Sequence, residues 1–590
     1  MKKLIIFLSF LFITSLWAQN PSVPWAHFGG GEKHDYLVAS EVHPSTGWVI
    51  EIFETQSRDL FQTGEFACDS LISCCDSDYN FYIRIVDPVE KSLVAARYYG
   101  GAGDERKPSL FLYGDTLYLS FSVSPLSGHL ATLPAHVGQT HQGGLDVGLV
   151  AFEIPSLENL KQTFRGGSGT DLAGGIVVDT RGVFVSFSSY QNSYFPVFNG
   201  GEANHGKYDA GVFFLSHDFS RLYFSGHFGG LENDGYDGDD MPPVFLSTAD
   251  SDNLILVTES ESNDIANLGN GYWEPSEGAD IFSLVLEVKT DNRIIPSVTS
   301  LFGGNNDDHL TAIKVQNSIL YGVGYTEGDF PSGSIFYHVP LGTEDDIFVF
   351  ALSPNLQDRY WSYLIGGEGD DRAYAVELIP PYVFVGGESY SDSLSGLVDT
   401  YQLQNHGEGD GVVFRLQAGN IPILKSSFLG GAGTDGIRTL LWSPEMQSLL
   451  AGGYTGSPFD FPTDYGGLDP SHSGFMDGFD FAFGLDLQVE GTTTDIGEET
   501  IPTEYSLSQN YPNPFNPTTT ISFSLPEATQ VSIKIYDMLG REVSSLLHGN
   551  KVADGTHVVT WDASRFSSGT YFYRIQAGDF VSMKKMILLK

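Results

Sequence analysis

The sequence predicts an all-β chain, a seven-bladed β-propeller with 1+3 strand closure followed by a small Ig-like β-sandwich. A Gly-Gly turn followed by an acidic residue, clearest as FLGGAGTD at residues 428–435, recurs seven times at spacings of 63 to 74 residues. Self-similarity at such a period is typical of repeat architectures. Between the turns stand short runs of β-branched and aromatic residues, which predict strands. No stretch sustains apolar residues at helical spacing, which favours β structure.

The seven turns are interpreted as structural. Glycine reaches positive φ without a Cβ penalty, and the acidic residue that follows can accept hydrogen bonds from turn amides. We expect each turn to join the second and third strands of one four-stranded unit. The first glycines of the pairs are Gly29, Gly100, Gly166, Gly229, Gly303, Gly366 and Gly430.

The repeat unit reads as four strands, as in EDDIFVFALSP, RYWSYLIGG, EGDDRAYAVELIP and YVFVGGESY between residues 344 and 390. The first strand of the unit, counted separately, also occurs seven times. The chain enters at a second strand (PWAHFGG, from Pro24) and leaves after a first strand (DFAFGLDL, from Asp480). One strand from the end is therefore expected to complete a sheet begun at the start, which closes the ring and removes open edges.

These units resemble the bacterial β-propeller repeat often called the SBBP repeat. That repeat has a Gly-rich turn, an Asp and a following V-x-V-x-G strand. The resemblance covers most of residues 24–487, and the propeller domain is assigned to residues 22–488.

The N-terminus, MKKLIIFLSFLFITSLWAQN, has two lysines, an apolar run and the small residue Ala18 before an expected cut. This pattern predicts a Sec signal peptide over residues 1–18. No later stretch is long and apolar enough for a transmembrane helix. A formal net charge of −44 argues against nucleic acid as a partner. Cys68, with Cys74 or Cys75, is a candidate for one local disulfide after export.

Chemistry-bearing motifs are scarce, and no residue is assigned a catalytic role. No G-x-S-x-G, H-E-x-x-H or P-loop pattern occurs. No cofactor is required. Calcium is possible at the acidic segment NDGYDGDD, whose candidate ligands are Asp234, Asp237, Asp239 and Asp240. The alternative is a solvated acidic loop, because the spacing departs from the EF-hand pattern.

Long loops are expected on the face of the Gly-Gly turns, because strand direction alternates within a unit. An example is residues 189–209, with Tyr190, Tyr194, Phe195 and Phe198. These aromatic side chains could stack on a sugar or contact a protein. Equally, they could pack the crevices between blades.

After a polar, acidic linker at residues 489–504, residues 505–590 show alternation such as Ile521, Phe523 and Leu525, which predicts a small sandwich. This region resembles the type A C-terminal sorting domain of the type IX secretion system of Bacteroidetes-like bacteria. The matching pieces are NYPNPFNPTT, IYDMLGREV, THVVTWD, SSGTYFYRI and KKMILLK. The resemblance implies passage across the outer membrane by that machinery after Sec export, proteolytic removal of the domain, and release or surface attachment.

Repeats, export signals and missing catalytic motifs together predict a secreted or cell-surface binding or adhesion module for a glycan or protein. Two alternatives remain open. One is an extracellular hydrolase or lyase that acts on polysaccharide or peptide at the propeller axis. The other is a surface structural protein.

Overall fold

The computed structural model of the chain describes the following residues: 26–28, 34–57, 79–100, 103–124, 144–190, 195–204, 207–235, 244–250, 252–262, 273–274, 278–304, 306–328, 330, 344–353, 355–392, 394, 405, 407–417, 421–457, 477–483, 487, 505–507, 510, 513, 515, 517–526, 529–552, 555–563, 565–578 and 580–589.

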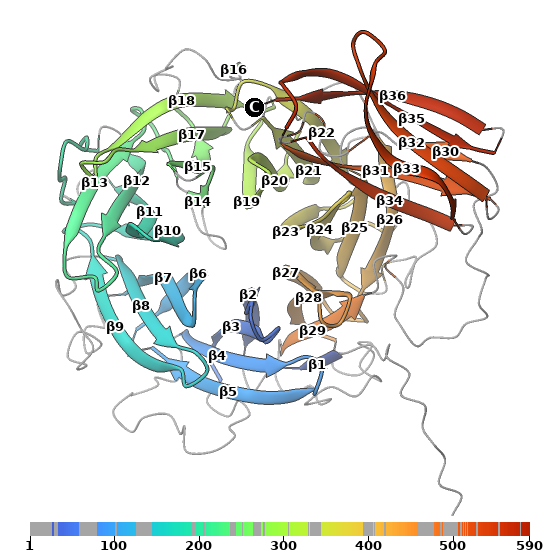
Figure 1. Cartoon of the computed structure of the whole chain (residues 1–590). Helices are drawn as coiled ribbons and strands as arrows, with labels where there is room; N and C mark the ends of the chain where they lie inside the picture. The colour runs from blue at the N-terminus through green and yellow to red at the C-terminus, as the bar shows by residue number, and fades with distance from the viewer. Residues whose placement is uncertain are drawn as a thin grey trace, which may run out of the picture.

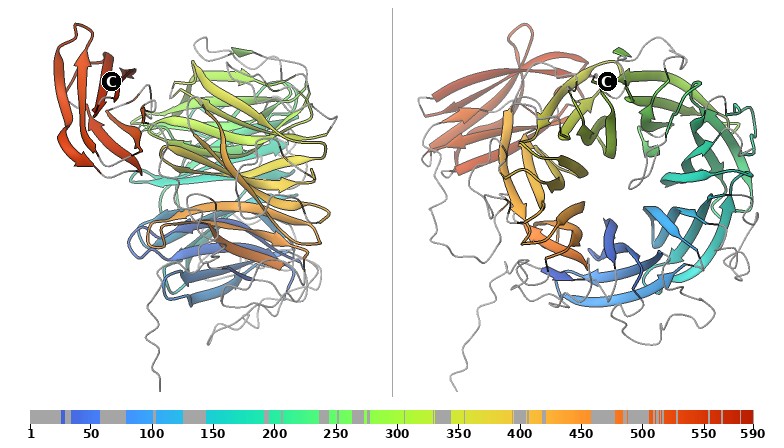
Figure 2. Two further views of the ribbon diagram at one scale, coloured as in Figure 1. Left: turned by 90° about the vertical axis from the view of Figure 1, so that its right-hand side faces the viewer. Right: turned by 180° about the vertical axis from the view of Figure 1, so that it is seen from behind.

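Every regular element in the described residues is a β-strand, and most of the strands form four-stranded antiparallel sheets. Seven sheets stand side by side around a central opening (Figure 1). Seen edge-on, they form a thick disc (Figure 2). From the axis outward, the first three sheets are β2 (Asp35–Val42), β3 (Val49–Thr55), β4 (Asn80–Asp87), β5 (Ser92–Tyr99); β6 (Glu105–Tyr113), β7 (Thr116–Val123), β8 (Asp146–Glu153), β9 (Glu158–Arg165); and β10 (Asp171–Asp179), β11 (Gly182–Tyr190), β12 (Tyr208–Leu215), β13 (Leu222–Phe228).

The remaining four sheets continue round the ring in chain order. They are β14 (Val244–Thr248), β15 (Asn253–Ser260), β17 (Asp280–Val288), β18 (Ile294–Phe302) with the short parallel β16 (Trp273–Glu274) at its edge; β19 (Asp308–Gln316), β20 (Ile319–Thr326), β21 (Asp346–Leu352), β22 (Arg359–Ile365); β23 (Asp371–Ile379), β24 (Tyr382–Ser389), β25 (Asp410–Gln417), β26 (Ile421–Leu429); and β27 (Asp435–Ser443), β28 (Ser448–Thr455), β29 (Asp477–Phe483), β1 (Ala26–Phe28).

The ring is closed both near its axis and at its rim. Near the axis, each innermost strand packs against the next, from β2 through β6, β10, β14, β19, β23 and β27, and β27 packs against β2. At the rim, β1 pairs with β29 in the last sheet. The expected pairing of these two strands is therefore present. Because it joins strands from the two ends of the repeat region, the ring needs no unpaired edge at this point.

The predicted grouping of strands into sheets was wrong: each predicted group of four is displaced along the chain by two strands from the observed sheet. Each Gly-Gly turn leaves the outermost strand of one sheet and enters the innermost strand of the next, as between β22 and β23. It does not join the second and third strands of one sheet. The seventh sheet accordingly combines three strands from the end of the repeat region with one from its start, the reverse of the expected composition. Alternation identified the strands but carried no information on which four share a sheet.

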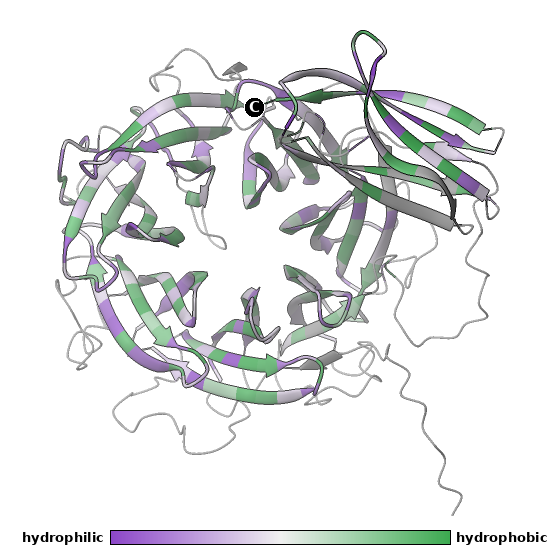
Figure 3. Cartoon of the chain, viewed as in Figure 1, coloured by the Kyte–Doolittle hydropathy of each residue, from purple (hydrophilic) through white to green (hydrophobic). Residues whose placement is uncertain are grey.

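The hydrophobic core is divided among the junctions between neighbouring sheets. One cluster joins sheets five and six through residues such as Tyr321, Val349 and Phe414. Another joins sheets one and two, and includes Phe81 and Phe152. Strands in the middle of the sheets are nearly all buried, and Figure 3 shows them largely hydrophobic. Burial of these flat apolar faces against one another is the main force that holds the ring together.

A second, smaller fold unit follows. One sheet holds β30 (Ser506–Leu507), β31 (Thr518–Leu525) and β34 (Gly555–Asp562), and the other holds β33 (Glu542–Val552), β32 (Thr529–Asp537), β35 (Gly569–Ala577) and β36 (Phe580–Leu588). Alternate residues of both sheets meet in a single core around Trp561. The unit is therefore a two-sheet sandwich, seen in red in Figure 2.

Candidate functional site

A cavity of about 570 Å³ lies on the axis of the ring. Its lining includes residues from all seven innermost strands, and from β3 and β28 beside them. Tyr36 and Arg106, each the second residue of its strand, line the end of the cavity nearest the Gly-Gly turns. This volume is in the range of pockets that hold small ligands.

A repeated β-bulge supplies side chains to this cavity. In six of the innermost strands the pairing register slips by one residue, a few positions after the acidic residue that opens the strand. A bulge turns the extra residue out of the regular pleat and re-aims its side chain. We call six cavity-lining residues, one taken from each of these slips, the bulge ring: Val38, Lys107, Gly175, Thr311, Tyr374 and Arg438.

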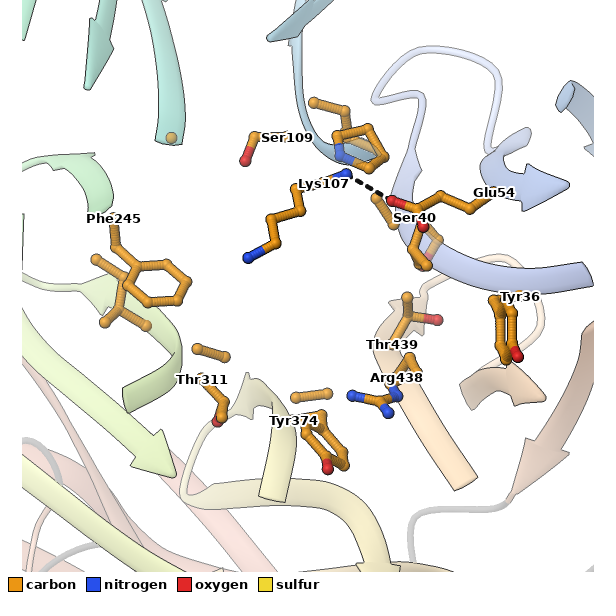
Figure 4. Close-up of a pocket in the computed structure, with 18 of the residues that line it drawn as sticks. Tyr36, Ser40, Glu54, Lys107, Ser109, Phe245, Thr311, Tyr374, Arg438 and Thr439 are labelled. Atoms are coloured by element: carbon orange, nitrogen blue, oxygen red, sulfur yellow. Dashed lines mark hydrogen bonds between the residues drawn. The ribbon is translucent and has the colours of Figure 1, made fainter. Parts of the chain in front are cut away.

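Lys107 is the bulge-ring residue of the second sheet. Its φ of 57° lies in the left-handed region, which is uncommon for a residue with a side chain. Its backbone N–H donates to Glu54 Oε1 at 2.5 Å, which holds the bulge in place. Figure 4 shows the lysine side chain extending into the open part of the cavity. The strained backbone thus presents an amine to the cavity.

Arg438 is held against aromatic rings. Its guanidinium carbon lies 3.6 Å from the centre of the Tyr374 ring and 5.4 Å from that of Tyr454. Tyr374 Oη donates to Glu388 Oε1 at 2.9 Å, and Tyr454 Oη donates to Glu388 Oε2. Burial raises the pKa of both tyrosines well above the ordinary value, so both hydroxyls stay protonated and remain donors. Buried Glu388 therefore fixes the two rings that support the guanidinium.

Among the described residues that line the cavity, only Glu54 is acidic. Its Oε2 accepts a hydrogen bond from Arg106 Nε at 2.8 Å, and the Arg106 guanidinium lies over the Tyr79 ring at 4.1 Å. Burial raises the pKa of Glu54, and the charge of Arg106 opposes that rise. The Glu54 carboxylate is thus engaged by Arg106 and by the Lys107 amide.

The charge on the cavity wall is opposite in sign to that of the whole chain. Arg106, Lys107, Lys314 and Arg438 line the cavity, against Glu54. Lys314 is paired with Glu377 at 2.8 Å, but Glu377 and Glu388 lie behind the wall and do not line it. Cationic and aromatic groups therefore line the cavity, whereas most of the balancing carboxylates do not. Such a wall suits binding of an acidic, ring-containing ligand better than acid–base catalysis.

The Gly-Gly turns lead into the strands that form the cavity wall. The described glycines of these turns do not line the cavity. Each described turn glycine packs against buried acidic or amide side chains. A Cβ on Gly430 would meet Asp410 Oδ1 at 2.3 Å and Asp435 Oδ2 at 2.7 Å. The amide of the next glycine, Gly431, donates to Asp435 Oδ2 at 2.8 Å. Gly29 lies outside the described residues.

Of the calcium candidates, only Asp234 falls in the described part of the chain. It is fully buried and accepts hydrogen bonds from the hydroxyls of Ser260 and Ser262 and from the amide of Gly230. Asp237, Asp239 and Asp240 lie outside the described residues, so the calcium site stays a prediction. Within the described residues no group of three or more metal-ligating side chains is present.

Described residues on either side of this acidic segment contact the same strand, β15: Asp234 bridges Ser260, and Val244 pairs with Thr258.

The aromatic loop residues divide between core and surface. Phe195 is buried and stacks on Phe187, with ring centres 4.0 Å apart. Phe198 is 49% exposed. Tyr194 lies outside the described residues, as do Ala18 and the three cysteines, whose assignments stay predictions. This loop joins β11 and β12 inside the third sheet and does not connect two sheets.

The bulge-ring residues were not identified from the sequence. A signal for them exists, because four stand three places after the acidic residue that opens the strand: Val38 after Asp35, Thr311 after Asp308, Tyr374 after Asp371 and Arg438 after Asp435. At that place the residue type changes from one repeat to the next, whereas the residue directly before it is apolar in all four: Leu37, Leu310, Ala373 and Ile437. Only the register shows that this variable position faces the axis.

The family comparison concerns the C-terminal sandwich. Residues 509–589 match the model of the secretion system C-terminal sorting domain, Por_Secre_tail. This part of the chain is a type IX sorting domain. The resemblance seen in its sequence motifs is confirmed, and the domain supports secretion or cell-surface localisation through the type IX machinery. Among the described residues no helix is long and apolar enough to span a membrane.

No curated protein matches the chain. Among solved structures, a protein of unknown function from Dyadobacter fermentans aligns with 9% identity and a TM-score of 0.34, covering 78% of this chain and 98% of its own. The parainfluenza virus 5 hemagglutinin-neuraminidase with the ligand DANA aligns with 8% identity and a TM-score of 0.33, covering 77% and 91%. The Pyrococcus horikoshii acylaminoacyl peptidase aligns with 7% identity and a TM-score of 0.34, covering 84% and 59%. Similarities this low carry no argument about function.

Proposed function

We propose that this protein is an exported binding module, a seven-bladed β-propeller that holds a glycan ligand in its axial cavity and is delivered by its C-terminal sorting domain. The observation that carries the proposal is the convergence of all seven innermost strands on one cavity with an aromatic and cationic wall. Rigid strands that present variable side chains to a common space are a typical basis for selective binding.

The wall favours binding over hydrolysis. Glycoside hydrolysis generally needs two carboxyl groups on either side of the scissile bond. Among the described lining residues Glu54 is the acid present, and it is engaged by Arg106. Tyr36, Tyr79 and Phe245 instead offer ring faces and edges for contact with sugar rings.

The proposal extends to the sandwich and to the repeats of the ring. The sandwich is of the Ig-like type, and its role is to direct the binding module across the outer membrane after Sec export. The ring belongs with the SBBP-type repeats, whose Gly-rich turn and opening Asp it shares. Adhesion to a surface polymer is the function that a ligand-binding ring at the cell exterior would serve.

Binding at the axis is tested with the full mature chain, a glycan array and purified surface polysaccharides. Ser109 lines the cavity and is half-buried, so Ser109→Trp fills the space without disturbing a core. Val89→Trp places the same side chain on an exposed turn at the outer part of a sheet and is the matched control. We expect binding that Ser109→Trp abolishes and Val89→Trp preserves.

Equal binding by both variants would contradict the axial site. Turnover of a polysaccharide that is lost in Glu54→Gln would replace the binding role with the hydrolase or lyase alternative. Thermal melting of each variant verifies that the ring remains folded.

A further inference from the structure

We propose that the ligand of the axial cavity is a saccharide chain of two or more units, which lies along a continuous band of aromatic rings on one side of the cavity wall. This inference rests on the proposed function, because it identifies the length and the course of the ligand in the same cavity. We call the band the aromatic arc, and its members all line the cavity: Tyr79, Tyr36, Tyr454 and Tyr374, with Arg106 and Arg438.

Contacts join one half of the aromatic arc without a gap. The Arg106 guanidinium carbon lies 4.1 Å from the centre of the Tyr79 ring. The centres of the Tyr79 and Tyr36 rings are 6.4 Å apart. Tyr36 in turn meets Tyr454 edge to face, with ring centres 5.6 Å apart. Side chains from three neighbouring sheets therefore form one surface on this side of the cavity.

Arg438 continues the arc to the sixth sheet. Its guanidinium carbon lies 5.4 Å from the centre of the Tyr454 ring and 3.6 Å from that of Tyr374. Figure 4 shows Tyr36, Arg438 and Tyr374 in succession along one side of the cavity, with Phe245 on the opposite side from Tyr36. A wall that is aromatic along its length suits an extended ligand better than a compact one.

A buried carboxylate supports each end of the arc. Glu54 accepts a hydrogen bond from Arg106 Nε at 2.8 Å, and Glu388 accepts hydrogen bonds from the hydroxyls of Tyr374 and Tyr454. Glu54 is 5% exposed and Glu388 is 3% exposed, so both carboxylates stand behind the surface that they support. Side chains held in this way lose little conformational entropy when a ligand binds.

The rings of the arc divide into supporting rings and contact rings. Tyr374 and Tyr454 are buried, whereas Tyr36 and Tyr79 are half-buried and so present part of their surface to the cavity. The planes of these two contact rings are tilted by 38°. Their separation is comparable to that of neighbouring rings in a saccharide chain, so each can contact the apolar C–H face of one unit. A single sugar would contact only one of them.

The arc begins at the end of the cavity nearest the Gly-Gly turns. Tyr36 and Arg106 are each the second residue of an innermost strand, and Tyr454 pairs with Gly436, which has the same place in β27. A chain that enters from this end reaches Tyr36 and Tyr79 first. The guanidinium groups on either side of these rings offer N–H donors to the sugar hydroxyls. The rest of the chain leaves the ring on the face of the Gly-Gly turns.

The test uses the full mature chain in calorimetric titration with monosaccharides and their linear tetrasaccharides. The pairs are glucose with cellotetraose, N-acetylglucosamine with its β-1,4-linked tetramer, and galacturonate with tetragalacturonate. The variants are Tyr36→Ala, Tyr79→Ala and the double substitution. Tyr113→Ala is the matched control, because Tyr113 is a 37% exposed tyrosine at the opposite end of β6 and does not line the cavity.

We expect at least one tetrasaccharide to bind about tenfold or more tightly than its monosaccharide, because it contacts a second ring and further N–H donors. Each single substitution weakens binding of that tetrasaccharide by about three- to tenfold, the contribution of one aromatic contact. The double substitution removes the advantage of the longer chain, whereas Tyr113→Ala preserves it. Tyr36→Phe, which retains the ring, keeps most of the affinity.

Thermal melting of each variant verifies that the ring remains folded. If an alanine variant melts early, Tyr36→Leu and Tyr79→Leu repeat the test, because leucine fills much of the same volume without an aromatic face. We expect these leucine variants to lose the advantage of the longer chain as the alanine variants do.

Four results would overturn this inference. They are equal affinity for each tetrasaccharide and its monosaccharide, an unchanged length advantage in the double substitution, an equal loss in Tyr113→Ala, and no binding of any tetrasaccharide. If Ser109→Trp abolishes a binding that is independent of chain length, the axial binding function stands and the aromatic arc is wrong. If Ser109→Trp leaves all binding intact, the proposed function itself is wrong.

Discussion

At the scale of single residues, several junctions between sheets gather two buried acidic groups around one glycine. Gly303 stands between Asp280 and Asp308, and Gly166 stands between Asp146 and Asp171. One acid comes from the third strand of a sheet and the other opens the innermost strand of the next. The glycine is required because a Cβ would collide with both carboxyl groups. At these junctions the repeated motif therefore places two buried titratable carboxyl groups next to each other.

This pairing predicts that the ring loses stability as the pH rises toward neutrality. Burial raises the pKa of Asp308 to about 7, and the charge of Asp280 adds to the rise. Burial and Asp371 raise the pKa of Asp346 to about 7. Between about pH 4 and pH 7 these groups keep a proton in the folded state that they lose on unfolding. The free energy of unfolding therefore falls with rising pH across this window and levels off above it.

Thermal melting from pH 4.5 to pH 8 measures this effect. We expect the melting temperature to fall over the range, and Asp308→Asn, which cannot ionise, to flatten part of the slope. Asp218 is the control, because hydrogen bonds from Ser216 and Ser220 lower its pKa to about 2. Asp218→Asn should leave the slope over this range unchanged. A melting temperature that rises between pH 5 and pH 7 would contradict the prediction.

At the scale of elements, the sequence predicted strands and turns well and their grouping poorly. Runs such as DIFVFAL at β21 are unmistakable as strands because β-branched and aromatic residues stand between turn residues. The Gly-Gly turn joins two antiparallel strands whether or not they share a sheet, so its local chemistry does not mark the boundary. The boundary shows only in contacts between segments that are separated in the sequence, such as the hydrogen bond from the Asp371 amide to the Asp345 carbonyl, which no local pattern encodes.

The residues that line the axial cavity could not be identified from the sequence for a related reason. Arg438 and Lys107 reach the axis because each lies at a one-residue slip of register. A strand of uninterrupted alternation would place these residues on another face. The sequence shows these two charged residues, but the bulge that turns them toward the axis appears only when the partner strand is known.

The closure of the last sheet gives a prediction for β1. Ala26, His27 and Phe28 pair with Phe481, Asp480 and Phe479 at the rim. Removal of residues 22–33 from the mature chain should expose the free edge of β29. We expect a lower free energy of unfolding, by roughly 1 kcal/mol for each ladder hydrogen bond lost, and self-association through the exposed edge.

Urea unfolding and sedimentation velocity measure these two effects. His27→Ala keeps the backbone of β1 and is the matched control, for which we expect near-native stability and a monomer. If the shortened chain were as stable as the full one, closure of the ring would depend on the innermost strands alone.

At the scale of the whole molecule, the ring and the sandwich have separate cores. The sandwich core joins its own two sheets around Trp561, Tyr573 and Phe523. Each ring cluster lies within or between neighbouring sheets of the ring. Two independently packed units are consistent with a division of labour in which one binds and the other directs export.

Removal of residues 505–590 should therefore leave a folded ring that is not secreted. In a host with a type IX system, we expect the shortened protein to accumulate in the periplasm, detected by fractionation, with a ring melting transition like that of the full chain. Ile533 is fully buried in the sandwich, so Ile533→Asp should block export in the same way by unfolding the sorting domain without shortening the chain. Ser545→Asp, at a half-buried position of β33, is the control and should be exported. Secretion of the protein without its sandwich would show that the ring carries an export signal of its own.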